Sequence, residues 1–277
     1  MKRIFLLVAI SALTTSATAE TIWTTDGFEQ PESALVNPVT GNIIVSNIVG
    51  GPSDVDGNGY LSLVAQDGTV VEKKWATGLD GPKGMALVSD QLFVADITNV
   101  RVLDANSGEQ LSVHAAEGSV FLNDVTTDGK DVYISDMMTH TIWKYSDGAL
   151  ESWMTNEALA HPNGLLWDDG KLLVGSWGLD IQADFTTKEL GALLSVDPAT
   201  MEIKALTDKL GNLDGIIRIG NMLYVSDWVA GTVYSVSADG STTMVAQYDM
   251  GAADLGQLGG SILVPHMMSD ELHLIAR

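Results

Sequence analysis

Short apolar runs alternate with turn-forming residues along the whole chain. Residues 161–177 (HPNGLLWDDGKLLVGSW) show the pattern best, because two apolar runs flank the dipeptide Asp169-Gly170. Apolar runs around such a dipeptide are typical of a β-hairpin. Helical periodicity is almost absent, apart from one turn expected at 156–160. The pattern predicts an all-β protein.

The hairpin pattern occurs six times. Each copy opens with a short tripeptide and closes at the end of its second apolar run. The central residues of the opening tripeptides are Glu32, Lys83, Asn123, Asn163, Asp214 and Asp254, and the closing residues are Asn47, Asp96, Asp136, Ser176, Asp227 and His266. Each central residue lies 12 to 15 residues before its closing residue, and successive central residues lie 51, 40, 40, 51 and 40 residues apart. Repeats of this length, built from short strands, indicate propeller blades.

The last repeat is one strand short, because a single strand, near 271–277, follows His266. Residues 21–24 (TIWT) have the spacing of an outermost strand: Trp23 precedes Glu32 by nine residues, much as Trp75 precedes Lys83 by eight. We therefore expect a six-bladed β-propeller of four-stranded blades. The N-terminal strand would close the ring by pairing into the last blade, which hides exposed strand edges.

The N-terminus has the features of a secretory signal peptide. Lys2 and Arg3 precede an apolar run over 4–13, which is too short to span a bilayer, and small residues follow at 17–19. We expect a signal peptide over 1–19, cleavage near Ala19, and a propeller domain over 20–277 in the periplasm or outside the cell. Later stretches are not apolar enough to predict a membrane span.

Composition narrows the chemistry. The chain has no cysteine, so disulfides, thiol catalysis and thiolate metal sites are excluded. The formal net charge is −22, which disfavours nucleic acid and anionic lipid and favours cations. A small molecule is the expected partner.

The six central residues form a candidate site. Propeller symmetry would place all of them on one circle around the axis, and all are polar. Local turns explain Asn and Asp at such positions but explain Glu32 and Lys83 poorly. Converging carboxylates repel one another and raise each other's pKa, which a divalent cation would relieve. Oxygen ligands without His or Cys favour Ca²⁺, although another divalent cation would also fit.

The repeats resemble the six-bladed propeller of the regucalcin/gluconolactonase family, over essentially all of 20–277. In that family a Glu of the first blade, an Asn of the fourth and an Asp of the fifth bind the catalytic calcium. Glu32, Asn163 and Asp214 match these positions. The resemblance also implies that Asn123, in the third blade, orients the substrate and that Asp214 acts as general base or nucleophile. The implied activity is calcium-dependent hydrolysis of a lactone or ester.

Two positions depart from the family pattern. Sugar-lactone members carry an Arg where this chain has Phe121, which predicts a less polar substrate. Lys83 is unusual in the ring. It would hold an anionic substrate group, pair with Glu32 or Asp254, or replace the metal with its ammonium. We expect Lys83, Phe121, Asn123, Trp177 and Asp254 to contact the substrate.

Other interpretations remain open at the sequence level. A non-catalytic periplasmic binding propeller with a structural calcium explains the same ring. Copper handling by two Met pairs, His140 and His266 is a third hypothesis; the pairs are Met137-Met138 and Met267-Met268.

Two blades carry insertions. One contains Asp54–Asn58, which resembles half of an EF-hand loop or a plain hairpin tip. The other, Gly178–Glu189, is a surface loop or a lid.

Overall fold

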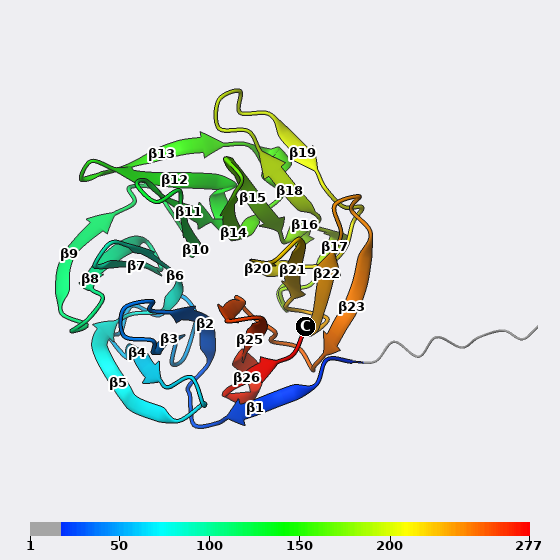
Figure 1. Ribbon diagram of the computed structural model, residues 1–277. Helices are drawn as coiled ribbons and strands as arrows, with labels where there is room; N and C mark the ends of the chain where they lie inside the picture. The colour runs from blue at the N-terminus through cyan, green and yellow to red at the C-terminus, as the bar shows by residue number, and fades with distance from the viewer. Residues whose placement is uncertain (1–17) are drawn as a thin grey trace, which may run out of the picture.

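The computed structural model describes residues 18–277, so the predicted signal peptide lies outside the described residues except for Thr18 and Ala19. Six four-stranded antiparallel sheets are arranged around a central axis, as Figure 1 shows. The prediction of a six-bladed, all-β propeller is confirmed. Within 18–277, the structure has no helix long and apolar enough to span a membrane.

Every blade runs from an innermost strand at the axis to an outermost strand at the rim. The innermost strands are β2 (Pro31–Val36), β6 (Pro82–Val88), β10 (Leu122–Thr127), β14 (Pro162–Asp168), β20 (Leu213–Ile219) and β24 (Gly256–Leu258). The second strands are β3 (Ile43–Asn47), β7 (Gln91–Asp96), β11 (Val132–Asp136), β15 (Lys171–Ser176), β21 (Met222–Asp227) and β25 (Ser261–His266). The third strands are β4 (Gly59–Val64), β8 (Asn99–Asp104), β12 (Thr141–Ser146), β18 (Leu193–Val196), β22 (Thr232–Val236) and β26 (Glu271–Ile275). The outermost strands are β5 (Val70–Leu79), β9 (Gln110–Ala115), β13 (Ala149–Thr155), β19 (Ile203–Ala205), β23 (Thr242–Gln247) and β1 (Thr21–Thr25).

The N-terminal strand closes the ring as expected. β1 pairs antiparallel with β26, with Trp23 opposite Leu274 and Thr25 opposite Leu272. Figure 1 shows the two strands side by side, blue beside red, at the seam between the chain ends. The last blade therefore takes its outermost strand from the beginning of the chain.

The hydrophobic core is divided into clusters that lie between neighbouring blades. Ile134 of β11 packs with Phe93 of β7, for example, and Leu272 of β26 packs with Val45 of β3. The alternation of apolar residues seen in the sequence places one face of each sheet against the next blade. Blade-to-blade packing rather than a single central core holds the wheel together, and this leaves the axis open for polar side chains.

Both insertions are ordered in the structure. Gly178–Ile181 (β16) and Thr187–Leu190 (β17) form a separate two-stranded hairpin in the fourth blade. In the first blade, the Asp56 carboxylate accepts hydrogen bonds from the backbone and side chain of Asn58, at 3.0 and 2.7 Å. These local bonds account for the Asp54–Asn58 segment as a hairpin tip.

The strand register corrects the predicted frame of the last blade. In the first five blades, the first residue of each opening tripeptide pairs with the closing residue, as Pro31 does with Asn47. In the sixth blade, Ala252 pairs with His266. Ala253, not Asp254, is therefore equivalent to Glu32, and the predicted position of Asp254 on the ring is wrong by one residue.

Candidate metal and substrate site

Five innermost strands share a break in register directly after their first pair. In β2 the pairing moves from Pro31–Asn47 to Ala34–Val45, and the same irregularity occurs in β6, β10, β14 and β20. The residue after each first pair is buried and lines one pocket at the axis. These residues are Glu32, Lys83, Asn123, Asn163 and Asp214, which we call the axial ring. The structure brings together five of the six residues predicted for the circle.

Glycines allow the innermost strands to approach one another closely. Gly164 follows Asn163, and a Cβ atom there would collide with the backbone carbonyl of Asp214 in the next blade. A Cβ atom on Gly215 would collide with the backbone of Asp254 and Leu255 in the same way. A side chain at either position would push two blades apart and separate the ring residues.

Two serines connect neighbouring blades directly behind the ring. The Ser135 hydroxyl accepts a hydrogen bond from Asp124 N at 2.9 Å and donates one to the Asn163 carbonyl at 2.7 Å. Ser226 links Gly215 N, at 2.8 Å, to the Ala253 carbonyl, at 2.8 Å. These bonds fix the backbone that carries the ring residues, a role that the sequence analysis did not predict.

The closing residues of the second strands hold the loops that lead into the ring. Asp136 accepts hydrogen bonds from the backbone of Val120, at 3.1 Å, and of Phe121, at 3.0 Å. Asp96 accepts them from Asp80 and Gly81, with the shortest at 2.7 Å. The repeated acid at this position, visible in the sequence, thus has a structural role.

Four ring oxygens are buried and have no hydrogen-bond partner among residues 18–277. They are Glu32 Oε2, Asn123 Oδ1, Asn163 Oδ1 and Asp214 Oδ1. Buried polar atoms are normally hydrogen-bonded, so four such oxygens in one pocket require an explanation. Two carboxylates and two amide oxygens, with no nitrogen or sulfur donor, form a set that a hard divalent cation satisfies.

The electrostatics of the ring favour a cation as well. Burial raises the pKa of Glu32 well above its usual value, and the Asp214 and Asp254 carboxylates raise it further. Burial, together with Asp254 and Asp227, also raises the pKa of Asp214. Both groups therefore lack compensation as anions and would gain from a positive charge.

Lys83 lies beside the predicted metal position rather than in it. Its ammonium nitrogen donates to the carbonyl oxygens of Pro52, at 3.0 Å, and Gly81, at 2.9 Å. Within the described part of the chain, Lys83 forms no ion pair with Glu32 or Asp254. Burial lowers the pKa of Lys83 to about 8, while Glu32 and Asp96 oppose this shift.

Apolar side chains form the wall of the pocket above the ring. The cavity has a volume of about 190 Å³. Its apolar wall residues are Ile48, Phe121, Met137, Trp177, Phe185, Trp228, Met267 and Met268. The insertion hairpin contributes Phe185, whose carbonyl oxygen accepts a hydrogen bond from Trp177 Nε1 at 2.9 Å. The pocket therefore combines an oxygen-rich floor with an apolar wall.

Asp254 lies outside this pocket. Its carboxylate accepts a hydrogen bond from the Ser33 hydroxyl at 2.6 Å, and it lines a second cavity along the axis together with Asp124. Burial raises the pKa of Asp254 to about 7. The structure thus separates Asp254 from the other residues predicted to contact the substrate, and Asp254 acts on the ring through its charge.

The comparisons with known proteins agree with the fold. The sequence matches no family model and no curated protein. A gluconolactonase from Xanthomonas campestris has a similar structure, with a TM-score of 0.66 and 17% identity over 91% of this chain and 87% of that chain. A putative gluconolactonase has a TM-score of 0.65 and 18% identity over 94% of this chain and 92% of that chain. Virginiamycin B lyase from Staphylococcus aureus has a TM-score of 0.63 and 12% identity over 92% of this chain and 98% of that chain.

Proposed function

We propose that this protein is a calcium-dependent hydrolase of a small lactone or ester. The observation that supports this function best is the group of four unpartnered oxygens on the floor of an apolar pocket. The similarity in fold to gluconolactonase structures adds support, although identities of 17% and 18% by themselves indicate only the fold.

Glu32, Asn163 and Asp214 would hold the calcium ion, with the Asn123 amide oxygen directed into the same space. When bound, the ion supplies Lewis acidity toward the substrate carbonyl. Asn123 would also orient the substrate, since its amide group lines the pocket.

Asp214 would act as the general base. Its buried carboxylate has a raised pKa, which makes it a stronger base than an exposed aspartate. It would remove a proton from the attacking water at a carboxylate oxygen, and the water oxygen would form the new bond to the acyl carbon. If Asp214 instead attacked the carbonyl as a nucleophile, a single turnover in ¹⁸O-water would label its carboxylate.

The wall of the pocket determines the substrate class. Phe121 and Trp177 are both buried and apolar, which favours an alkyl or aryl substituent on the substrate over a polyhydroxylated sugar acid. Lys83 has two carbonyl partners and a third N–H donor left over, so an anionic or carbonyl group of the substrate would bind there.

The test is hydrolysis of a panel of γ- and δ-lactones and aryl esters by the purified protein, with calcium and with chelator. We expect turnover that chelation abolishes and added calcium restores. Asp214→Asn should abolish turnover, whereas Asp208→Asn, on an exposed loop, should leave it unchanged. If chelation lowers the Tm while no substrate is hydrolysed, the protein is a binding propeller with a structural calcium and the hydrolase proposal is wrong.

We also propose that the protein is exported. The predicted signal peptide would direct it to the periplasm or the medium, where calcium sites of modest affinity are filled. Fractionation of cells that produce the full-length chain tests this, and recovery of uncleaved protein from the cytoplasm would contradict it.

A further inference from the structure

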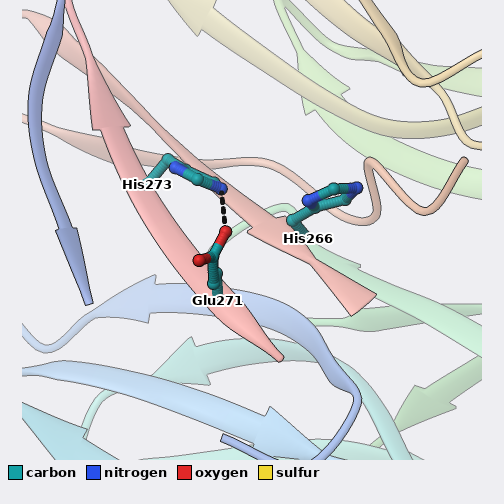
Figure 2. Close-up of side chains that lie close together, drawn as sticks. All are labelled: His266, Glu271 and His273. Atoms are coloured by element: carbon teal, nitrogen blue, oxygen red, sulfur yellow. Dashed lines mark ion pairs between the residues drawn. The ribbon is translucent and has the colours of Figure 1, made fainter. Parts of the chain in front are cut away.

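The last blade carries a cluster of His266, Glu271 and His273 away from the axial pocket. His266 ends β25 and lies opposite Glu271, the first residue of β26. His273 lies two residues further along β26. Because residues two apart on a strand share a face, and directly opposed residues do too, all three side chains project from the same face of the sheet. Figure 2 shows His273 and Glu271 on one strand and His266 approaching from its neighbour.

The ligand atoms of the three side chains are close enough to share one ion. One nitrogen or oxygen atom of each lies within 4.8 Å of the others. His273 Nε2 lies 3.3 Å from Glu271 Oε2, the interaction drawn dashed in Figure 2. His266 is 5% exposed and His273 is 8% exposed, so the two imidazoles are largely shielded from water.

Groups outside the cluster orient both imidazole rings. The Asp249 carbonyl oxygen can only accept, so its 3.3 Å hydrogen bond with His266 Nε2 places the proton on Nε2 and leaves the lone pair on Nδ1. His273 Nδ1 lies 2.9 Å from Thr24 Oγ1, and donation to this hydroxyl leaves the lone pair on Nε2. Metal-binding histidines are typically held by such outer hydrogen bonds through the second ring nitrogen.

His273 Nε2 is a buried atom that needs a partner. Among residues 18–277 it has no hydrogen bond of acceptable geometry, despite the nearby Glu271 carboxylate. Burial lowers the pKa of His273, which favours the neutral ring that a metal requires. Tyr248 packs against both imidazoles, with centroid distances of 5.4 Å to His266 and 5.0 Å to His273.

The position of His266 is also unusual within the repeat. The corresponding residues Asp96, Asp136 and Asp227 accept hydrogen bonds from backbone N–H groups of loops. An imidazole in this place donates to a carbonyl instead. The last blade therefore replaces a loop-holding acid with a metal-binding side chain.

We infer that His266, Glu271 and His273 form a second metal site, for a divalent transition metal of the Zn²⁺ type. Two imidazoles and one carboxylate suit zinc, and three protein ligands leave a fourth position for water or an exogenous ligand. The axial ring, in contrast, offers oxygen atoms alone. The two sites lie apart in the described structure, since none of the three cluster residues lines the axial pocket.

The test is a calorimetric titration of ZnCl₂ into the full-length protein in excess calcium, which occupies the axial site. We expect one Zn²⁺ per chain at this site, and Co²⁺ in place of zinc should give the visible absorption of a tetrahedral ion. Glu271→Gln changes a half-exposed side chain and should fold normally. It should weaken zinc binding about tenfold or more, and Thr24→Val, through His273, should weaken it by about tenfold.

The matched control is the double variant His140→Gln/His161→Gln. These two histidines also lie close together, with ring centroids 4.1 Å apart, but on another blade. We expect the control to bind zinc as the unaltered protein does. If zinc does not bind, or if Glu271→Gln binds it as tightly as the unaltered protein, the second site does not exist and the cluster is an ordinary ion pair.

Discussion

The ammonium nitrogen of Lys83 lies 4.6 Å from the centroid of the Phe121 ring, on the wall of the axial pocket. A cation over an aromatic face is stabilised by the negative charge density of the ring. Phe121 thus occupies the place where sugar lactonases are expected to carry an Arg, and it positions a positive charge that comes from a different blade. The pocket retains one cation while gaining an apolar surface.

This arrangement predicts that Lys83→Met selectively weakens the binding of anionic substrates. The variant keeps the length of the side chain but removes the charge, so KM should rise about tenfold for a lactone that carries a carboxylate. KM for a neutral aryl ester and kcat for both substrates should change little. Steady-state kinetics on the matched pair of substrates measures this difference.

Lys130→Met is the control, because Lys130 is exposed, with 71% side-chain accessibility, and lies far from the pocket residues. An equal rise in KM for both substrates in Lys83→Met would show that Lys83 maintains the pocket rather than reading the substrate charge.

Glu32→Gln should reduce the stabilisation of the protein by calcium. At a calcium concentration of about 100 times Kd, binding contributes about 2.7 kcal/mol and should raise the Tm of a domain of this size by about 5–10 °C. Gln keeps the shape of Glu32 but removes its charge, so most of this rise should be lost. Thermal unfolding monitored by circular dichroism, with calcium and with chelator, provides the measurement.

Glu29→Gln is the matched control for this experiment. Glu29 lies three residues before Glu32 but is partly exposed and pairs with Lys73 at 2.9 Å. An unchanged calcium response in Glu32→Gln would remove Glu32 from the metal site.

Raising the pH should destabilise the calcium-free protein. Burial raises the pKa of Glu32 and Asp214, and that of Asp254 to about 7. Such a carboxyl stabilises the fold below its unfolded pKa of about 4, and this contribution is lost as the pH rises through the folded pKa. In chelator, the Tm should fall between about pH 4 and pH 7, and calcium should reduce this fall because a cation stabilises the ionised carboxylates.

Thermal melts across this pH range, in chelator and in calcium, test the prediction. Glu32→Gln removes one of the titrating groups, so its calcium-free Tm should depend less on pH than that of the unaltered protein. A calcium-free Tm that rises steadily with pH would contradict the assignment of these carboxyls as uncompensated.

Gly164→Ala should separate two blades at the axial ring. The added methyl group would collide with the Asp214 carbonyl, and relief requires movement of the backbone. We expect a loss of about 1–3 kcal/mol in the free energy of unfolding, together with a loss of calcium binding. Denaturant unfolding and calcium titration measure the two effects.

Gly170→Ala is the control from the β14–β15 hairpin. Gly170 has a φ of +74°, and a Cβ atom there would meet no neighbour within 4 Å. This variant should lose about 1 kcal/mol through backbone strain and still bind calcium. Normal calcium binding in Gly164→Ala would show that the approach of these two strands does not position the ring.

The sequence was sufficient to predict the propeller and most of the axial ring. Turn dipeptides between apolar runs identified the hairpins, and a repeat of 40 or 51 residues identified the blades. The frame failed in the last blade, where Asp254 lies 12 residues before His266 while its counterparts in the preceding four blades lie 13 before theirs. That one-residue difference was the signal that Ala253 occupies the ring position, as the pairing of Ala252 with His266 shows.

Other parts of the site depend on contacts that spacing does not encode. The Pro52 carbonyl that binds Lys83 lies in an insertion 31 residues away, so the repeat pattern carries no information about it. The grouping of His266 with His273 requires the register of β25 and β26 and the hydroxyl of Thr24 from the opposite end of the chain. The hypothesis of copper handling joined His266 to the neighbouring Met residues, whereas the structure places it beside Glu271 and His273.

The pairing of β1 with β26 has a consequence for biosynthesis. The strand that leaves the ribosome first waits for the one that leaves almost last, so the circle is incomplete until translation is nearly finished. Because the oxygen donors at the hub come from four separate blades, a nascent or proteolytically shortened polypeptide has no assembled centre. Activity, once measured, would therefore report on the integrity of the molecule from one terminus to the other.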